Sequence, residues 1–178
     1  MTGQIRATIS TTSKYLPEKV MTNHDLEKLV DTNDEWIVSR TGISERRVVE
    51  SGQATADMCI HVARKILQKR DISADDIDVI IIGTVTPDML LPSTAALVQD
   101  AIGASSAWGY DLSAACSGFL FALETGVNLI ESGRYNKVLV LGADTMTSIL
   151  DYEDRGTCVL FGDGAGGVLL EPSQDENY

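Results

Sequence analysis

The sequence has few histidines, few cysteines and few basic side chains. Its 178 residues include two histidines and three cysteines, and 14 lysines and arginines stand against 26 aspartates and glutamates. The net charge of −12 argues against nucleic acid or an anionic membrane surface as a partner. No Cys-x-x-Cys or His-x-x-x-His pair is present, so we expect no metal site.

Signals for membrane insertion and export are also missing. The longest apolar run, around residues 77–86, has the length of a strand. The first residues, Met-Thr-Gly-Gln-Ile-Arg, lack a signal-peptide pattern, and an odd number of cysteines fits free thiols in a reducing cytosol. These features predict a cytoplasmic protein without disulfides and without membrane contact.

A glycine pattern near the C-terminus has the letters of a dinucleotide-binding motif but not its context. Gly162, Gly164 and Gly167 satisfy Gly-x-Gly-x-x-Gly. That motif needs a helix directly after the glycines, whereas residues 168–171, Val-Leu-Leu-Glu, are typical of a strand. We therefore expect these glycines to let backbone segments pack closely, and we predict no dinucleotide site.

Segments with strand-like and helix-like patterns alternate along the chain. Apolar residues spaced by three and four predict a helix over 55–70, and Ser93 can cap a second helix that Gly103 closes. Five segments have the composition of strands: 4–10, 78–85, 107–112, 137–143 and 165–171. The alternation predicts an α/β fold, with a mostly parallel five-stranded sheet and helices on both faces.

The stretch from Trp108 to Gly126 contains a candidate nucleophile. It has the pattern of a strand, a turn of small residues, Cys116 and an apolar helix buried on most faces. We expect Cys116 in the first turn of that helix, where unpaired backbone N–H groups and the helix dipole favour the thiolate. The alternative is a small buried hydrophobic residue, which is the common fate of a lone cysteine.

A candidate binding site lies around Trp36. Trp36 and Arg40 stand one helical turn apart on one face, and an indole beside a guanidinium suits a flat anionic ligand such as a nucleotide. Arg46 and Arg47 follow as a local basic cluster. The alternative is a tryptophan packed on a surface helix with the arginine lying over it.

Four segments, taken together, point to a known family. They are Asp31-Thr-Asn-Asp-Glu-Trp-Ile-Val-Ser-Arg-Thr-Gly-Ile43, Ala114-Ala-Cys-Ser-Gly118, Asp154-Arg-Gly-Thr157 and Phe161-Gly-Asp-Gly-Ala-Gly166. In this order they resemble β-ketoacyl-acyl carrier protein synthase III of bacterial type II fatty-acid synthesis. The resemblance runs from about residue 4 to about residue 172.

The resemblance implies a thiolase-like fold, in which two similar halves of five strands each stack as α-β-α-β-α layers. Residues 1–172 would form the N-terminal half, and residues 173–178 would begin the linker to a missing second half. The family's catalytic histidine and asparagine belong to that second half. His24 and His61 lie in no matching motif, and both are expected to be exposed surface residues.

The resemblance also implies roles for residues of both candidate sites. Cys116 would take the acyl group, with its own backbone N–H as one oxyanion donor. The adenine of coenzyme A would lie between Trp36 and Arg155, with Thr32 hydrogen-bonding it and Arg40 near the phosphates.

Three further positions match residues of the family's acyl pocket: Leu91, Met146 and Phe161. Leu91 falls where the family places a residue, most commonly phenylalanine, that reaches into the partner subunit's pocket. The smaller side chain would change the wall of that pocket, so other starter groups are expected to fit.

The implied reaction is a decarboxylating Claisen condensation. Acetyl-CoA or another short acyl-CoA would acylate the cysteine, and malonyl-acyl carrier protein would supply the enolate that gives acetoacetyl-acyl carrier protein. Acyl-CoA is then a substrate, and no cofactor is implied. The implied partners are acyl carrier protein, a second copy in a homodimer and the complementary C-terminal half. The alternatives are a related condensing enzyme of secondary metabolism and a non-catalytic assembly subunit.

Overall fold

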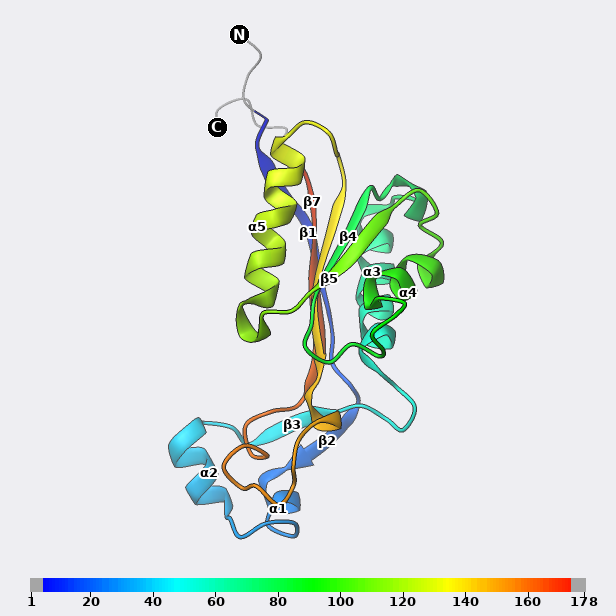
Figure 1. Cartoon of the computed structure of the whole chain (residues 1–178). Coiled ribbons are helices and arrows are strands. Elements are labelled where there is room, and N and C mark those ends of the chain that lie inside the picture. The colour runs from blue at the N-terminus through cyan, green and yellow to red at the C-terminus, as the bar shows by residue number, and fades with distance from the viewer. Residues whose placement is uncertain (1–4, 174–178) are drawn as a thin grey trace.

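A five-stranded sheet forms the centre of the molecule (Figure 1). The computed structural model describes residues 5–173. The strands lie in the order β1-β7-β6-β4-β5. Their bounds are Ala7–Tyr15 for β1, Asp163–Pro172 for β7, Val138–Thr145 for β6, Val79–Gly83 for β4 and Trp108–Leu112 for β5.

The sheet is mixed, which corrects part of the prediction. β4 pairs in parallel with β5 and β6, whereas β7 pairs antiparallel with both β6 and β1. Four strands therefore point the same way and only β7 opposes them, so half of the pairings are antiparallel. Parallel neighbours need a helical crossover, and the segment between β6 and β7 contains only a short 3₁₀ turn, Met146–Ser148. A loop of this kind returns the chain antiparallel.

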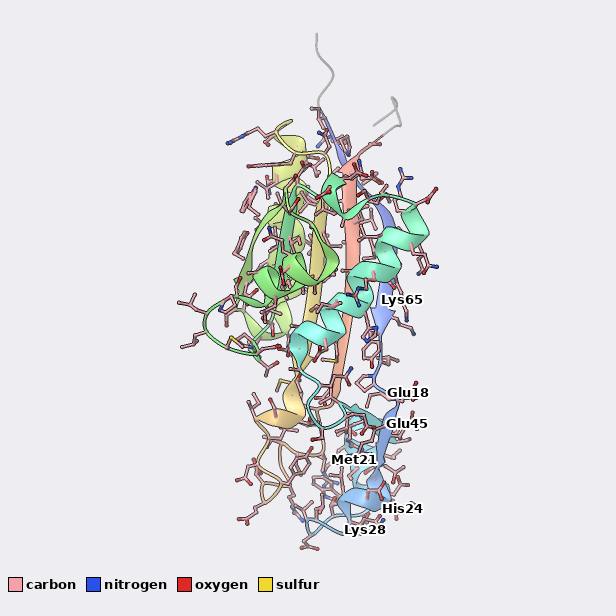
Figure 2. All side chains as sticks on the ribbon, turned by 90° about the vertical axis from the view of Figure 1, so that its right-hand side faces the viewer. Glu18, Met21, His24, Lys28, Glu45 and Lys65 are labelled. Atoms are coloured by element: carbon pink, nitrogen blue, oxygen red, sulfur yellow. The ribbon has the colours of Figure 1, made fainter. Side chains whose placement is uncertain are left out.

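Helices cover both faces of this sheet, as the sequence predicted. α3 (Thr55–Arg70) and α4 (Thr94–Ile102) cover one face, which is turned toward the viewer in Figure 2, with Lys65 on the outer side of α3. α5 (Gly118–Glu131) covers the other face (Figure 1). β4, between these layers, is buried along its whole length.

The helix boundaries follow from capping groups that are visible in the sequence. The hydroxyl of Ser93 accepts a hydrogen bond from the Ala96 N–H at 3.2 Å, and Gly103 ends α4 with a left-handed φ of 79°. α3 matches its predicted bounds. β1 lies later than the predicted 4–10, because its alternating pattern continues to Tyr15, two residues before Pro17.

A small lobe at one end of the sheet was not predicted as a unit. It contains β2 (Lys19–Thr22), α1 (Asn23–Leu26), α2 (Asp34–Thr41) and β3 (Glu45–Val48), with β2 and β3 paired antiparallel (Figure 1). The loop between β6 and β7 closes over it and adds Cys158 and Val159 to a core with Leu26 and Ile37. Figure 2 shows Met21, His24 and Lys28 in this lobe, away from α3 and α4.

Several expectations concern what the chain does not contain. No helix of the described residues is long and apolar enough to cross a membrane. In the same part of the chain, His, Cys, Asp and Glu form no group that could hold a metal ion. Residues 174–178, nearly all of the expected linker, lie outside the described residues.

Candidate active site

Cys116 lies at a tight elbow between β5 and α5. It occupies the 3₁₀ turn Ala115–Ser117, and its side chain is exposed. Ala115 has a left-handed φ of 46°, a conformation that costs a non-glycine residue about 1–3 kcal/mol. α5 begins only at Gly118, so Cys116 precedes the helix instead of lying in its first turn. The alternative, a small buried cysteine, is wrong for this residue.

Close backbone contact fixes the start of α5. A Cβ added to Gly83, the last residue of β4, would lie 2.7 Å from the Gly118 carbonyl carbon and 2.8 Å from the Phe119 nitrogen. A Cβ on Gly142 of β6 would lie 3.1 Å from the Phe119 side chain. The start of α5 therefore rests directly on the end of β4 and on Gly142 within β6, and backbone contact with Gly83 holds the elbow that carries Cys116.

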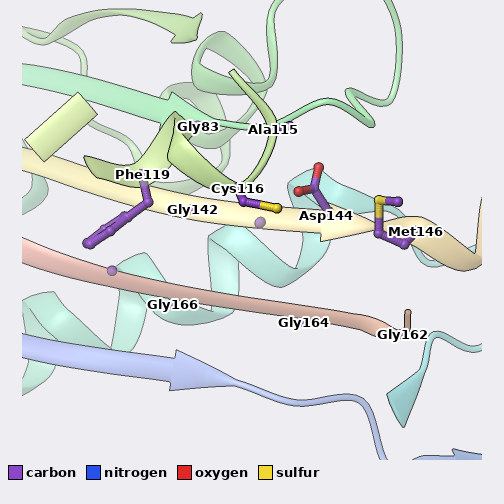
Figure 3. A pocket seen from close by; sticks show the side chains of 12 residues that line it. Gly83, Ala115, Cys116, Phe119, Gly142, Asp144, Met146, Gly162, Gly164 and Gly166 are labelled. Atoms are coloured by element: carbon purple, nitrogen blue, oxygen red, sulfur yellow. The ribbon is translucent and has the colours of Figure 1, made fainter. Parts of the chain in front are cut away.

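Cys116 opens into a hollow of about 440 Å³. Figure 3 shows its side chain lying over β6 and pointing toward Asp144 and Met146. Glycines of β4, β6 and β7 border this space and contribute no side chains to it. We call it the Cys116 hollow, and its lining residues are Gly83, Ala115, Cys116, Phe119, Gly142, Ala143, Asp144, Met146, Gly162, Gly164, Gly166 and Gly167.

Asp144 ties the hollow to the loop that follows β4. Its Oδ1 accepts hydrogen bonds from the Val85 N–H at 2.8 Å and from the hydroxyls of Thr84 and Thr86 at 3.0 Å each. Ionised acceptors make the stronger class of hydrogen bond. The loop that leads to Leu91 is therefore anchored at the rim of the Cys116 hollow.

A second group of residues gathers on the lobe. The guanidinium carbons of Arg40 and Arg155 lie 4.5 Å and 5.2 Å from the centre of the Trp36 ring. Arg155 comes from the β6–β7 loop, and its Nη1 donates to the Asp31 carbonyl at 2.9 Å. The Oγ1 of Thr32 is shielded from solvent and has no hydrogen-bond partner within the described structure. We call Trp36, Arg40 and Arg155 the Trp36 cluster.

The structure groups the predicted site residues only in part. Met146 lines the Cys116 hollow, whereas Leu91 and Phe161 do not. Leu91 is 85% exposed on the loop between β4 and α4, and Phe161 is 37% exposed. The residues of the Trp36 cluster also lie outside the hollow lining.

Comparison with known proteins shows which proteins this chain is similar to. The family model for 3-oxoacyl-[acyl-carrier-protein (ACP)] synthase III matches residues 110–178. A curated relative from Chlorobaculum tepidum, named β-ketoacyl-[acyl-carrier-protein] synthase III, is 62% identical over 175 residues, which are 98% of this chain and 53% of that protein. Over almost its whole length, the chain is similar to one half of the β-ketoacyl-acyl carrier protein synthase III proteins. It spans about half the length of the curated relatives it matches.

Solved structures agree with this placement. The synthase III of Aquifex aeolicus VF5 is 45% identical with a TM-score of 0.91, over 97% of this chain and 55% of that one. A priming β-ketosynthase from the R1128 polyketide pathway is 32% identical with a TM-score of 0.93, over 97% of this chain and 52% of that one. The five-stranded layer is thus the thiolase-like fold of the synthase III family.

The other cysteines and the histidines of the chain lie elsewhere. Cys59 is buried on α3 and Cys158 in the lobe core, and burial raises the pKa of both thiols. His24 contacts Glu27, and His61 stacks on Tyr15 with ring centres 4.6 Å apart. Both histidines are exposed, as the sequence predicted. Neither histidine lines the Cys116 hollow.

Arg46 and Arg47, predicted as a local basic cluster, have different environments in the structure. Arg46 is only 4% exposed, and its guanidinium bonds to the Val159 carbonyl and to Asn23. The sequence carries no clear signal for this, because Glu45, Arg46 and Arg47 are all charged and the alternation of burial along β3 is a property of the structure. Without β3 in the prediction, that alternation could not be used.

Proposed function

We propose that this chain is the nucleophile-bearing half of a β-ketoacyl-acyl carrier protein synthase III that starts fatty-acid synthesis in the cytoplasm. The observation that carries the proposal is the exposed thiol of Cys116, held on a strained elbow over a hollow whose lining is rich in glycine. Such a placement lets a thioester carbonyl approach the sulfur while the backbone stays fixed. Acyl-CoA serves as a substrate, and no cofactor takes part.

The first half-reaction uses residues of this chain. The Cys116 thiolate attacks the carbonyl of acetyl-CoA, the tetrahedral intermediate collapses, and coenzyme A leaves as its thiolate and takes up a proton. The Cys116 N–H donates to the oxyanion of the intermediate. The product is an acetyl-cysteine and free coenzyme A.

The second half-reaction needs groups that this chain lacks. Malonyl-acyl carrier protein loses carbon dioxide, and the resulting enolate attacks the acetyl-cysteine to form acetoacetyl-acyl carrier protein and free the thiol. The family's histidine and asparagine for this step come from the complementary C-terminal half. Neither His24 nor His61 lies at the Cys116 hollow, which supports this division of the site.

The Trp36 cluster is proposed to bind the nucleotide of coenzyme A. Adenine between Trp36 and Arg155 needs two stacking distances, about 7 Å in all. The present distance of 5.2 Å from Arg155 to the ring is too short, so Arg155 moves outward when the base enters. Arg40 then lies near the phosphates, and the unpaired Oγ1 of Thr32 is available to the base.

Three residues are proposed to shape the acyl pocket. Met146 contributes from the end of the hollow, and Phe161 lies next to Gly162, which lines it. Leu91 is proposed to cross to the partner's pocket in a homodimer, which its exposure on an anchored loop supports. Leucine leaves more room than phenylalanine, so short starters beyond acetyl are expected as substrates.

Acylation of the thiol tests the proposal. The chain assembled with its complementary half is incubated with acetyl-CoA and digested for mass spectrometry. One acetyl group per site is expected on the peptide containing Cys116, and Cys116→Ala should abolish it with little change in melting temperature. Acetylation of Cys59 or Cys158 would overturn the assignment.

One observation favours a second candidate. The R1128 priming β-ketosynthase aligns with a TM-score of 0.93, so a condensing enzyme of secondary metabolism shares this geometry. Both candidates use Cys116, and a comparison of rates with several acyl-CoA starters and acceptor carrier proteins separates them. A non-catalytic assembly subunit, the third alternative, predicts no acetyl-cysteine at all.

A further inference from the structure

Arg46 is a buried cation without a carboxylate partner. It is 4% exposed, and it forms none of the ion pairs found within residues 5–173. Burial lowers the pKa of its guanidinium. A buried charge costs free energy unless it is hydrogen-bonded. The hydrogen-bond partners of Arg46 therefore indicate its structural role.

Those bonds join two separate parts of the lobe. The Nε donates to the Val159 carbonyl at 3.0 Å and the Nη2 donates to the same oxygen, while the Nη1 donates to Asn23 Oδ1. Asn23 is itself only 1% exposed, and its Nδ2 donates to Asp34 Oδ1 at 2.7 Å and to the Ile43 carbonyl at 2.9 Å. A relay of hydrogen bonds therefore runs from the β6–β7 loop to the first turn of α2.

Each end of the relay lies close to one member of the Trp36 cluster. Val159 follows the turn that carries Arg155, and the Cys158 N–H closes that turn on the Asp154 carbonyl at 3.0 Å. At the other end, Asp34 lies two residues before Trp36 on α2. A shift of either end therefore changes the distance between Arg155 and Trp36.

We infer that Arg46 and Asn23 are positioning residues that set the separation of Arg155 from Trp36 and so the affinity for the nucleotide of acyl-CoA. The inference rests on the proposed function of the Trp36 cluster. A guanidinium is required because its flat fork reaches Val159 and Asn23 together, whereas a lysine ammonium has no such fixed geometry. Neither residue touches the nucleotide itself.

The first test compares Arg46→Lys with Arg47→Lys in the complete synthase. Arg47 is the matched control, because it lies next in sequence but its side chain is partly exposed and contacts Pro17 and Glu45. Binding of adenosine 3′,5′-bisphosphate is followed by Trp36 fluorescence in a Trp108→Phe background. Arg46→Lys should raise the dissociation constant about tenfold. This change lies within the range of binding free energy that is lost when one base no longer stacks. Arg47→Lys should leave it within about twofold.

A kinetic readout separates positioning from a general loss of structure. With acetyl-CoA, Arg46→Lys should raise KM about tenfold. With acetyl-pantetheine, which lacks the nucleotide, both KM and kcat should match those of the unsubstituted synthase. Equal losses on the two substrates would overturn the inference, since they would mean that Arg46 only holds the fold together.

A second variant keeps the inference testable if Arg46→Lys does not fold. Asn23→Asp preserves the acceptor for Arg46 and gives it a counter-ion, but places a carboxylate against Asp34 and breaks that end of the relay. Nucleotide affinity should fall about tenfold, measured below the melting temperature of the variant. Affinity unchanged by both variants would overturn the inference alone. Failure of the unsubstituted synthase to bind the nucleotide would overturn the proposed function as well.

Discussion

The Cys116 hollow and the Trp36 cluster are built by opposite means. At the hollow, glycines bring backbone against backbone, and a Cβ on Gly83 would lie 2.7 Å from a main-chain atom of Gly118. At the cluster, long side chains from segments far apart in sequence meet on one indole, and the relay through Arg46 joins those segments. Backbone contacts fix the geometry of the hollow, whereas the geometry of the cluster depends on side chains that can move.

The difference matches what each site is proposed to do. A nucleophile must keep its geometry within a fraction of an ångström, which fixed backbone provides. A nucleotide site must open and close, as the 5.2 Å between Arg155 and the Trp36 ring requires. The comparison predicts that substitutions that disturb the backbone contacts beneath the hollow are severe and nearly all-or-none, whereas those at the cluster are graded and confined to one substrate.

The largest effect is expected when residues 1–178 are expressed alone. Leu120 and Phe121 on α5 are 61% and 55% exposed, which corrects the prediction of a helix buried on most faces, because only one side of α5 meets the sheet. Apolar patches of this kind favour association. We expect an insoluble chain or an associated species in size-exclusion chromatography. Leu120→Gln with Phe121→Gln should increase the soluble fraction, and a stable monomer with a cooperative melt would contradict the need for a second half.

Gly83→Ala should follow in severity. The added methyl group meets main-chain atoms of Gly118 and Phe119, which cannot move aside without shifting the elbow. Overpacking of this kind costs about 3 kcal/mol of the free energy of unfolding, measured by urea denaturation of the complete synthase. Acetylation of Cys116 should be lost at the same time. Gly166→Ala is the control, since its Cβ would come no nearer than 3.9 Å to a neighbour and should change stability little.

Trp36→Ala should give a smaller, substrate-selective loss. Stacking is worth about 1–3 kcal/mol per base, so KM for acetyl-CoA should rise accordingly while KM for malonyl-acyl carrier protein stays unchanged. Trp108→Phe serves as the control, because Trp108 stacks on Tyr110 in β5, outside the cluster. Equal rises in KM for both substrates would show that Trp36 has a packing role in the lobe and does not stack on the nucleotide.

The smallest effect is expected from acid. Hydrogen bonds from the Thr157 hydroxyl and the Gly156 N–H lower the pKa of Asp154 below its ordinary value of 3.8. At pH values above 3.8, the ionised carboxylate therefore stabilises the turn that carries Arg155. This contribution is lost as the pH falls through the lowered value in the folded state. As the pH is lowered, Trp36 fluorescence should therefore change at a higher pH than the rate of Cys116 acetylation and than global unfolding. Asp154→Asn should remove this early change, and its persistence in that variant would assign it elsewhere.

The sequence predicted what local patterns control and missed what distant segments build. α3 and α4 were found because apolar spacing and the caps at Ser93 and Gly103 are local signals. β2 and β3 were missed because Glu-Arg-Arg-Val does not look like a buried strand until Arg46 is known to have partners 23 and 113 residues away. The proximity of Trp36 and Arg155 was predicted from the family resemblance alone, because no sequence periodicity links the two residues.

The carboxylates that outnumber the basic side chains have a further role inside the fold. Asp111 receives the Thr94 and Ala95 N–H groups at 2.7 Å and 2.8 Å, and Asp163 receives those of Val49 and Thr147 at 2.9 Å each. Main-chain dipoles thus act as internal counter-charges for part of the −12 excess. Added salt weakens repulsion between exposed carboxylates but barely screens these buried contacts. Moderate ionic strength should therefore raise the melting temperature of this acidic chain instead of lowering it.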